Sequence, residues 1–187
     1  LQVTANEYTF ENELLNNLDY ENKKIVLLTS HRRENLGKPM ENIFTAMREI
    51  VEKHQDVEIV FPVHLNPKVR EIANEILSNN DRIHMIEPLD YLPFAHLQAR
   101  SYLIVTDSGG IQEEAPTLGK PVLVVRKETE RPEGIEAGTA KLIGLEKENI
   151  FKELDLVLSN KDEYQKMANA VNPYGDGKAA ERIVDII

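Results

Sequence analysis

The sequence predicts an α/β domain built on a doubly wound, parallel, Rossmann-like sheet. Short apolar runs alternate along the chain with longer stretches in which apolar residues recur at helical spacing. The short runs are nearly continuous in apolar residues, which is typical of strands buried on both faces of a parallel sheet. The 187 residues suffice for a sizeable core, and no repeat or linker divides them. We therefore expect a single domain over residues 1–187.

The strands are the short apolar segments. Two of them, KIVLLTS and PVLVV, consist mainly of valine, leucine and isoleucine, which fit a buried pleated surface. In chain order we expect strands at Lys24–Ser30, Val57–Val63, Ile83–Ile86, Tyr102–Val105, Pro121–Val125 and Leu142–Gly144.

The helices follow from apolar spacing and from residues that begin helices. Pro39 suits the first turn of the helix that follows the first strand. Asn66 is a suitable N-cap for the next helix. In chain order we expect helices at Glu7–Leu18, Pro39–His54, Pro67–Leu77, Asp90–Ala99, Gly110–Leu118, Glu148–Leu158, Asp162–Asn172 and Lys178–Ile187.

The composition limits the function. The net charge of −10 argues against nucleic acid and anionic membrane as partners, although a local anion site is compatible with an acidic protein. The chain has no cysteine, which excludes disulfides, thiolate zinc sites and cysteine nucleophiles. No apolar run approaches membrane-spanning length, and the opening LQVTANEYTF does not resemble a signal peptide, so we expect a cytoplasmic protein.

The segment TDSGGIQEEAP, Thr106 to Pro116, is the most informative motif. It connects a predicted strand to a predicted helix through a double glycine. The N-terminus of a helix stabilises an anion, and Gly109 and Gly110 let the backbone approach a ligand closely. The hydroxyl of Ser108 adds a donor, and Glu114 lies one turn further on, where it could accept hydrogen bonds from ribose hydroxyls. Phosphates beside a sugar suggest a nucleotide.

The same motif has a simpler interpretation. Asp-Ser-Gly-Gly is a common turn, and Ser108 followed by two acids is good helix-start chemistry without any ligand. The chain contains none of the motifs G-x-G-x-x-G, Walker A, G-x-S-x-G or H-E-x-x-H, which makes serine hydrolase chemistry improbable and leaves Ser108 as a phosphate donor.

Polar residues follow the first five predicted strands, and in a doubly wound sheet these strand ends meet at the edge where ligands bind. His31 could donate to a phosphate or act as acid or base, and Arg32 could clamp phosphate, although both also fit a charged loop with internal Arg–Glu pairs. Phe94 could stack on a base or belong to the core. Arg131 could reach a phosphate or sugar.

His64 follows a strand in the same way and is as readily structural as functional. It could share a metal ion with His31, but no third ligand is suitably spaced, so no metal is expected.

Together these motifs resemble the non-hydrolysing bacterial UDP-N-acetylglucosamine 2-epimerases. The resemblance begins near Lys24 and covers nearly the whole chain. It rests on HRREN (31–35), PVHLNP (62–67), EPLDYLPF (87–94), TDSGGIQEEAPTLGKPVLVVR (106–126), TERPEG (129–134), AGT (137–139) and NPYGDG (172–177).

The resemblance implies one half of a GT-B-like, two-domain enzyme. Such an enzyme interconverts UDP-N-acetylglucosamine and UDP-N-acetylmannosamine for cell-surface polysaccharide synthesis, by eliminating and re-adding UDP, without a cofactor. This chain corresponds to the C-terminal, nucleotide-binding half, so the N-terminal half is expected to be absent and Leu1–Glu21 to include an interdomain connection. The full enzyme is expected to be a homodimer, and the isolated chain to bind UDP weakly without turnover.

The resemblance also implies roles for individual residues. His31 is the candidate catalytic residue. Ser108, Gly109 and Gly110 hold the phosphates, Glu114 holds the ribose, Leu89 and Phe94 hold the uracil, and Arg131 faces the diphosphate or sugar. Arg32 and His64 match a site at which a second UDP-N-acetylglucosamine activates some bacterial members.

Two alternatives stay open at the level of sequence. One is the donor-binding domain of a GT-B glycosyltransferase, because the fold does not fix the reaction. The other is a nucleotide-sugar sensor without catalysis, since the carboxylates thought to move protons in the family lie in the other half.

Overall fold

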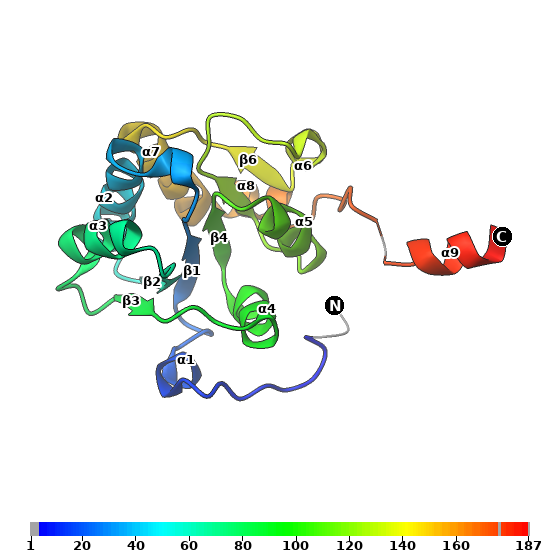
Figure 1. Ribbon diagram of the computed structural model, residues 1–187, viewed down its shortest axis with the longest axis horizontal. Coiled ribbons are helices and arrows are strands. Elements are labelled where there is room, and N and C mark those ends of the chain that lie inside the picture. Colours follow the sequence, from blue (N-terminus) through cyan, green and yellow to red (C-terminus); the bar gives the residue numbers. More distant parts are fainter. Residues whose placement is uncertain (1–3, 176, 187) are drawn as a thin grey trace.

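The computed structural model describes residues 4–175 and 177–186, which form a three-layer α/β domain (Figure 1). The central sheet has six strands, all pairing in parallel, in the order β3-β2-β1-β4-β5-β6. The strands are β1 (Lys24–Thr29), β2 (Val57–Pro62), β3 (Ile83–Ile86), β4 (Leu103–Thr106), β5 (Val122–Val124) and β6 (Ala140–Leu142). This is the predicted doubly wound, Rossmann-like fold, and its order reverses between β1 and β4.

Helices follow the strands and cover both faces of the sheet. They are α1 (Glu13–Asn17), the short 3-10 helix η1 (Arg33–Asn35), α2 (Lys38–Lys53), α3 (Pro67–Leu77), α4 (Tyr91–Arg100), α5 (Gly109–Thr117), α6 (Pro132–Ala137), α7 (Lys147–Ser159), α8 (Lys161–Ala168) and α9 (Ala179–Ile186). Among the described residues, every helix is too short or too polar to cross a lipid bilayer.

The core consists of two clusters, one on each face of the sheet. The larger packs α2, α3, α7 and α8 against alternate residues of the strands, such as Val26 and Leu28. The smaller packs α1, α4 and α5 against the intervening residues, such as Ile25 and Leu27. Because each strand buries side chains on both faces, its sequence is a continuous apolar run.

The helices that lead away from β3 and β4 begin with different capping chemistry from that of α3. At α3 the side chain of Asn66 accepts a hydrogen bond from the backbone N–H of Lys68, as its sequence position predicts. At α4 and α5 the N-cap residues, Asp90 and Ser108, make no capping hydrogen bond through their side chains. The N-termini of these two helices therefore remain open toward the carboxyl edge of the sheet.

The structure corrects the predicted helix at Glu7–Leu18. Only Glu13–Asn17 is helical, because the Asn16 side chain exchanges hydrogen bonds of 2.8 and 2.7 Å with the backbone of Phe10 and holds that residue outside the helix. Phe10 is buried against the face that carries α4. The assignment of residues 1–21 to an interdomain connection stays a prediction, and residues 1–3 lie outside the described residues.

In the first two thirds of the chain the other differences are small shifts of element bounds and the short helix η1, which was not predicted. Larger differences occur in the last third. α8 ends at Ala168, before the predicted Asn172, and β6 begins at Ala140 instead of Leu142. Helix α6 occupies the segment expected to be a loop; Pro132 stands in its first turn, and Gly138 ends it with a left-handed φ of 79°. The predicted helix Lys178–Ile187 corresponds to α9, which extends away from the sheet in Figure 1; Ile187 lies outside the described residues.

The larger core cluster should dominate stability. Phe44 and Phe61 are fully buried, with ring centroids 5.3 Å apart. We predict that Phe44→Ala lowers the free energy of unfolding by about 3–5 kcal/mol, because it removes a large apolar side chain and leaves a cavity. Val171→Ala, at an 82% exposed position, should change it by about 0.5 kcal/mol or less. Urea denaturation of both variants checks this, and a loss under about 1 kcal/mol for Phe44→Ala would contradict the assigned core.

Candidate functional site

The candidate site lies where the strand order reverses, at the carboxyl ends of β1 and β4. These strands are paired up to Thr29 and Thr106, whose hydroxyl oxygens lie 2.7 Å apart. Beyond them the chain leaves β1 toward one face of the sheet, through η1 and α2, and leaves β4 toward the other face, through α5. The two departing segments open a crevice between them, which is where doubly wound domains bind ligands.

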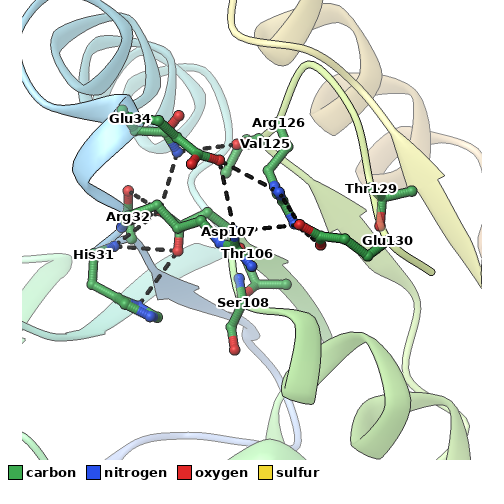
Figure 2. Close-up of polar contacts among 12 residues, drawn as sticks. His31, Arg32, Glu34, Thr106, Asp107, Ser108, Val125, Arg126, Thr129 and Glu130 are labelled. Atoms are coloured by element: carbon green, nitrogen blue, oxygen red, sulfur yellow. Dashed lines mark hydrogen bonds and ion pairs between the residues drawn. The ribbon is translucent and has the colours of Figure 1, made fainter.

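Asp107 joins the two sides of this crevice (Figure 2). Its carboxylate is fully buried and accepts hydrogen bonds from the backbone N–H groups of His31 and Arg32, at 2.9 and 3.0 Å. It also accepts from the Ser30 hydroxyl and the Asn35 side-chain amide, both at 3.1 Å. A buried carboxylate requires such donors, so Asp107 fixes the path of the HRREN segment directly beside the start of α5.

The start of α5 has the properties of an anion site. The first N–H groups of a helix have no intrahelical acceptor, and the Ser108 side chain does not cap them. The backbone is bare at Gly109, where a Cβ would lie 4.0 Å from the Nη2 atoms of both Arg32 and Arg131. Free N–H groups, the helix dipole and two guanidinium groups therefore converge on the same point.

Neighbouring acceptors, one on the backbone and one on a side chain, orient the two guanidinium groups. Arg32 donates from Nε to the backbone carbonyl of Asp107 at 3.0 Å. Arg131 pairs through Nε with the carboxylate of Glu113, one turn into α5, and this hydrogen bond raises the pKa of Arg131. Since these contacts use the Nε atoms, the Nη2 atoms of both arginines remain directed toward Gly109.

A second part of the crevice is an apolar pocket of about 250 Å³. It brings together four of the residues that the sequence analysis singled out, namely His31, His64, Leu89 and Phe94. The two imidazole rings are stacked, with centroids 5.6 Å apart. The Nδ1 atom of His31 lies 3.4 Å from Oδ1 of Asp107, so the Nε2 edge of the ring is the one available to a ligand.

Glu114 lies outside that pocket. It lines a neighbouring cavity of about 150 Å³ between α4 and α5, and its Oε2 accepts a hydrogen bond of 3.0 Å from the side-chain amide of Gln98. The structure thus divides the predicted site residues among three adjoining places: the start of α5, the apolar pocket and the α4–α5 cavity.

A network of charged residues borders the site on the β5 side (Figure 2). The buried guanidinium of Arg126 forms paired hydrogen bonds with the carboxylate of Glu130, and Glu130 also lies 3.6 Å from Arg32. The hydrogen bonds from Arg126 lower the pKa of Glu130 from 4.5 to about 2. Glu34 adds a weaker contact, 3.4 Å from Arg126. The network ties the loop after β5 to the HRREN segment.

Sequence reasoning missed three residues that shape the site. Asp107 was read as part of a turn, although its position directly after a buried strand is a signal for a functional strand end. Arg126 and Gln98 were not singled out, because nothing in the sequence shows that Gln98 faces Glu114 or that Arg126 is buried. No group of three or more residues able to hold a metal ion occurs within residues 4–175 and 177–186.

The fold and the crevice define a class. The chain is a doubly wound α/β domain with an anion-binding helix start at the point where the strand order reverses. A family model described as UDP-N-acetylglucosamine 2-epimerase matches residues 2–187, and the chain belongs to this family.

Individual relatives agree with this assignment. The chain is 59% identical to the UDP-N-acetylglucosamine 2-epimerase of Bacillus subtilis over 162 residues, which cover 87% of this chain and 43% of that protein. The structure of Staphylococcus aureus MnaA with UDP matches with a TM-score of 0.88 and 52% identity, over 94% of this chain and 47% of that one.

A second solved structure is that of the Neisseria meningitidis UDP-GlcNAc 2-epimerase bound to UDP-GlcNAc. It matches with a TM-score of 0.85 and 48% identity, over 89% of this chain and 45% of that one. The chain therefore spans about half the length of the relatives it matches, and its fold is one half of a GT-B-like epimerase structure.

The charged network predicts a particular acid dependence. A carboxyl group whose pKa is lowered by folding contributes stability above its unfolded pKa and loses it as the pH falls through its folded pKa. We expect the difference in unfolding free energy between wild type and Glu130→Gln to be constant above pH 4.5 and to shrink between pH 4.5 and about 2. Denaturation curves across this pH range provide the measurement.

Arg126→Met supplies the control, because it removes the main partner of Glu130. In that background the Glu130→Gln change should have a much smaller pH-dependent effect. An equal effect in both backgrounds would show that Arg126 does not hold the carboxylate.

Proposed function

We propose that this chain is the UDP-binding half of an enzyme that interconverts UDP-N-acetylglucosamine and UDP-N-acetylmannosamine. The observation that carries the proposal is the open start of α5, where Gly109 faces the guanidinium groups of Arg32 and Arg131 beside His31. Two further facts support it: relatives of this family have been solved with UDP and with UDP-GlcNAc, and the apolar pocket adjoins the anion site.

The proposed ligand position follows from the three places described. The diphosphate binds at Ser108–Gly110, where unpaired N–H groups and two guanidinium groups offset its charge. Uracil enters the apolar pocket, beside Leu89 and the ring of Phe94. The ribose lies along α5 toward Glu114, whose carboxylate accepts hydrogen bonds from hydroxyl groups.

The proposed reaction begins with elimination of UDP. The bond between sugar C1 and the β-phosphate oxygen breaks with its electron pair on that oxygen, while a base removes the proton from C2. UDP then re-adds across the resulting C1=C2 bond, and a proton returns to the other face of C2. Negative charge grows on the diphosphate as the bond breaks, so donors around it stabilise the transition state more than the ground state.

His31 is the proposed donor to the leaving group. Its ring lines the pocket next to the start of α5, and its backbone is held by Asp107. Imidazole can donate a hydrogen bond or a proton near neutral pH, which suits a group that assists a departing phosphate.

The base that moves the C2 proton must come from elsewhere in the enzyme. The carboxylates nearest the proposed diphosphate position, Glu113 and Glu130, already form ion pairs with Arg131 and Arg126 and are not placed as free bases. We assign the proton transfer to carboxylates of an N-terminal half that closes over this one in a cytoplasmic, homodimeric enzyme supplying a polysaccharide precursor. We also retain Arg32 and His64 as candidates for the activator site, although the Arg32 guanidinium points toward Gly109 as well.

The anion site can be tested by filling it. A Cβ at Gly109 has room, so Gly109→Asp should fold normally, because its carboxylate would pair with Arg32 and Arg131 and suits the first turn of a helix. We predict that UDP affinity falls at least about a hundredfold, since like charges now compete for one site. Calorimetric titration measures the affinity, and thermal denaturation checks the fold.

Gly109→Ala is the matched control, since it adds the Cβ without a charge; its UDP affinity should stay within about tenfold of wild type. UDP binding by Gly109→Asp at wild-type affinity would refute the proposed phosphate position.

The role of His31 needs the complete enzyme. We predict that His31→Asn lowers turnover by about 10²–10³-fold while UDP affinity changes much less, because the donor acts mainly on the developing charge. A residue that only orders the loop would instead reduce stability and leave turnover per folded molecule nearly normal. Turnover and UDP affinity measured on one folded preparation separate these roles, and a loss under about tenfold would reject the catalytic assignment.

A further inference from the structure

Gln98 holds the carboxylate of Glu114 in a defined orientation. Gln98 lies on α4 and is 1% exposed, and its Nε2 donates to Oε2 of Glu114 at 3.0 Å. An ionised carboxylate only accepts hydrogen bonds, so the NH₂ end of the amide must face it. The carbonyl oxygen of Gln98 therefore points away from Glu114.

That carbonyl oxygen is buried and has no hydrogen-bond partner among the described residues. A buried acceptor without a partner is costly and is rare in native proteins. Gln98 and Glu114 both line the cavity of about 150 Å³ between α4 and α5. A donor supplied from this cavity would satisfy the Gln98 oxygen.

The wall of the cavity thus carries two residues with acceptor groups, Glu114 and Gln98. The carbonyl oxygen of Gln98 is itself buried, so a ligand in the cavity reaches it only if the amide shifts toward the cavity. A ligand that satisfies both must present two donors on adjacent atoms. A vicinal diol has this arrangement, and the ribose of a ribonucleotide carries one at its 2′ and 3′ positions.

The positions of the two helices agree with a nucleoside bound along them. α4 and α5 each follow a strand of a parallel sheet, so both begin at the carboxyl edge and run in the same direction. Near that edge Phe94 of α4 and Ile111 of α5 line the apolar pocket. One turn further along, the helices carry Gln98 and Glu114. A base beside Phe94 would place its ribose near the acceptor pair.

We propose that Gln98 is a second ribose-binding residue: it positions Glu114 and accepts one of the two ribose hydroxyls, so that the site selects ribonucleotides over deoxyribonucleotides. This inference rests on the proposed UDP site and adds to it a residue that distinguishes ribose from deoxyribose.

The test combines protein variants with altered ligands. UDP, 2′-deoxy-UDP and 3′-deoxy-UDP are titrated by calorimetry into wild type, Gln98→Met and Glu114→Ala. Wild type should lose affinity for both deoxy ligands, roughly threefold to tenfold for the hydroxyl bound to the amide and about tenfold to a hundredfold for the one bound to the carboxylate. Gln98→Met should bind one of the deoxy ligands as tightly as it binds UDP, because the residue that accepted the missing hydroxyl is gone. Glu114→Ala should bind the other deoxy ligand as tightly as it binds UDP.

Gln112→Met is the matched control. Gln112 is also a buried helical glutamine, but its amide is satisfied at both ends, by the carbonyl of Ser108 and the hydroxyl of Thr129. Any change in its affinity should be the same for all three ligands.

Two results would overturn the role of Gln98 and leave the proposed function unaffected. Gln98→Met could bind UDP as tightly as wild type, or it could weaken all three ligands by one factor, as a structural role requires. Absence of UDP binding by the wild-type chain would overturn the proposed function itself, and the ribose assignment with it.

Discussion

The buried carboxylate of Asp107 is the constraint on which the site depends. It stands directly after β4, and the donors that satisfy it all come from the segment after β1, including the backbone of His31 and Arg32. A carboxylate this deeply buried is tolerated only when hydrogen bonds replace its hydration. The requirement ties the two strand ends together at the reversal of strand order. As a result, an imidazole and a guanidinium group are placed beside the open start of α5.

The charges around this point make a local cationic site in an acidic chain. The net charge is −10, yet the guanidinium groups of Arg32 and Arg131 both approach Gly109. Arg32 is oriented by the backbone carbonyl of Asp107 and by Glu130. Arg131 is oriented by Glu113. Such contacts restrict the arginine side chains before a ligand arrives, which reduces the entropy lost on binding. The site therefore combines preorganised donors with a neighbouring apolar pocket, in which we propose that the base binds.

Much of the fold could be predicted from the sequence, because local patterns decide it. Short apolar runs located β1 to β5, whereas the predicted sixth strand shares only Leu142 with β6. The Asn66 cap and apolar spacing gave α3 with its observed bounds. The rim residues were expected at one edge because parallel strands end there, although their binding roles stay predictions. Contacts between distant residues could not be read in this way. The burial of Asp107 and the Gln98–Glu114 pair depend on tertiary packing, which leaves no periodic signal. The contact between Asn16 and Phe10 that shortens α1 is local, but it is a side-chain contact that apolar spacing does not reveal.

The most direct test of the account is an NMR titration of the isotope-labelled chain with UDP. Backbone amide signals report binding residue by residue, and the free N–H groups at the start of α5 are the proposed phosphate donors. The account predicts the largest shifts at Gly109, Gly110 and Ile111, with further shifts at His31 and Leu89, while uridine without phosphates moves only the pocket signals. Saturable UDP binding that leaves the amides of Gly109 and Gly110 unchanged would contradict the account.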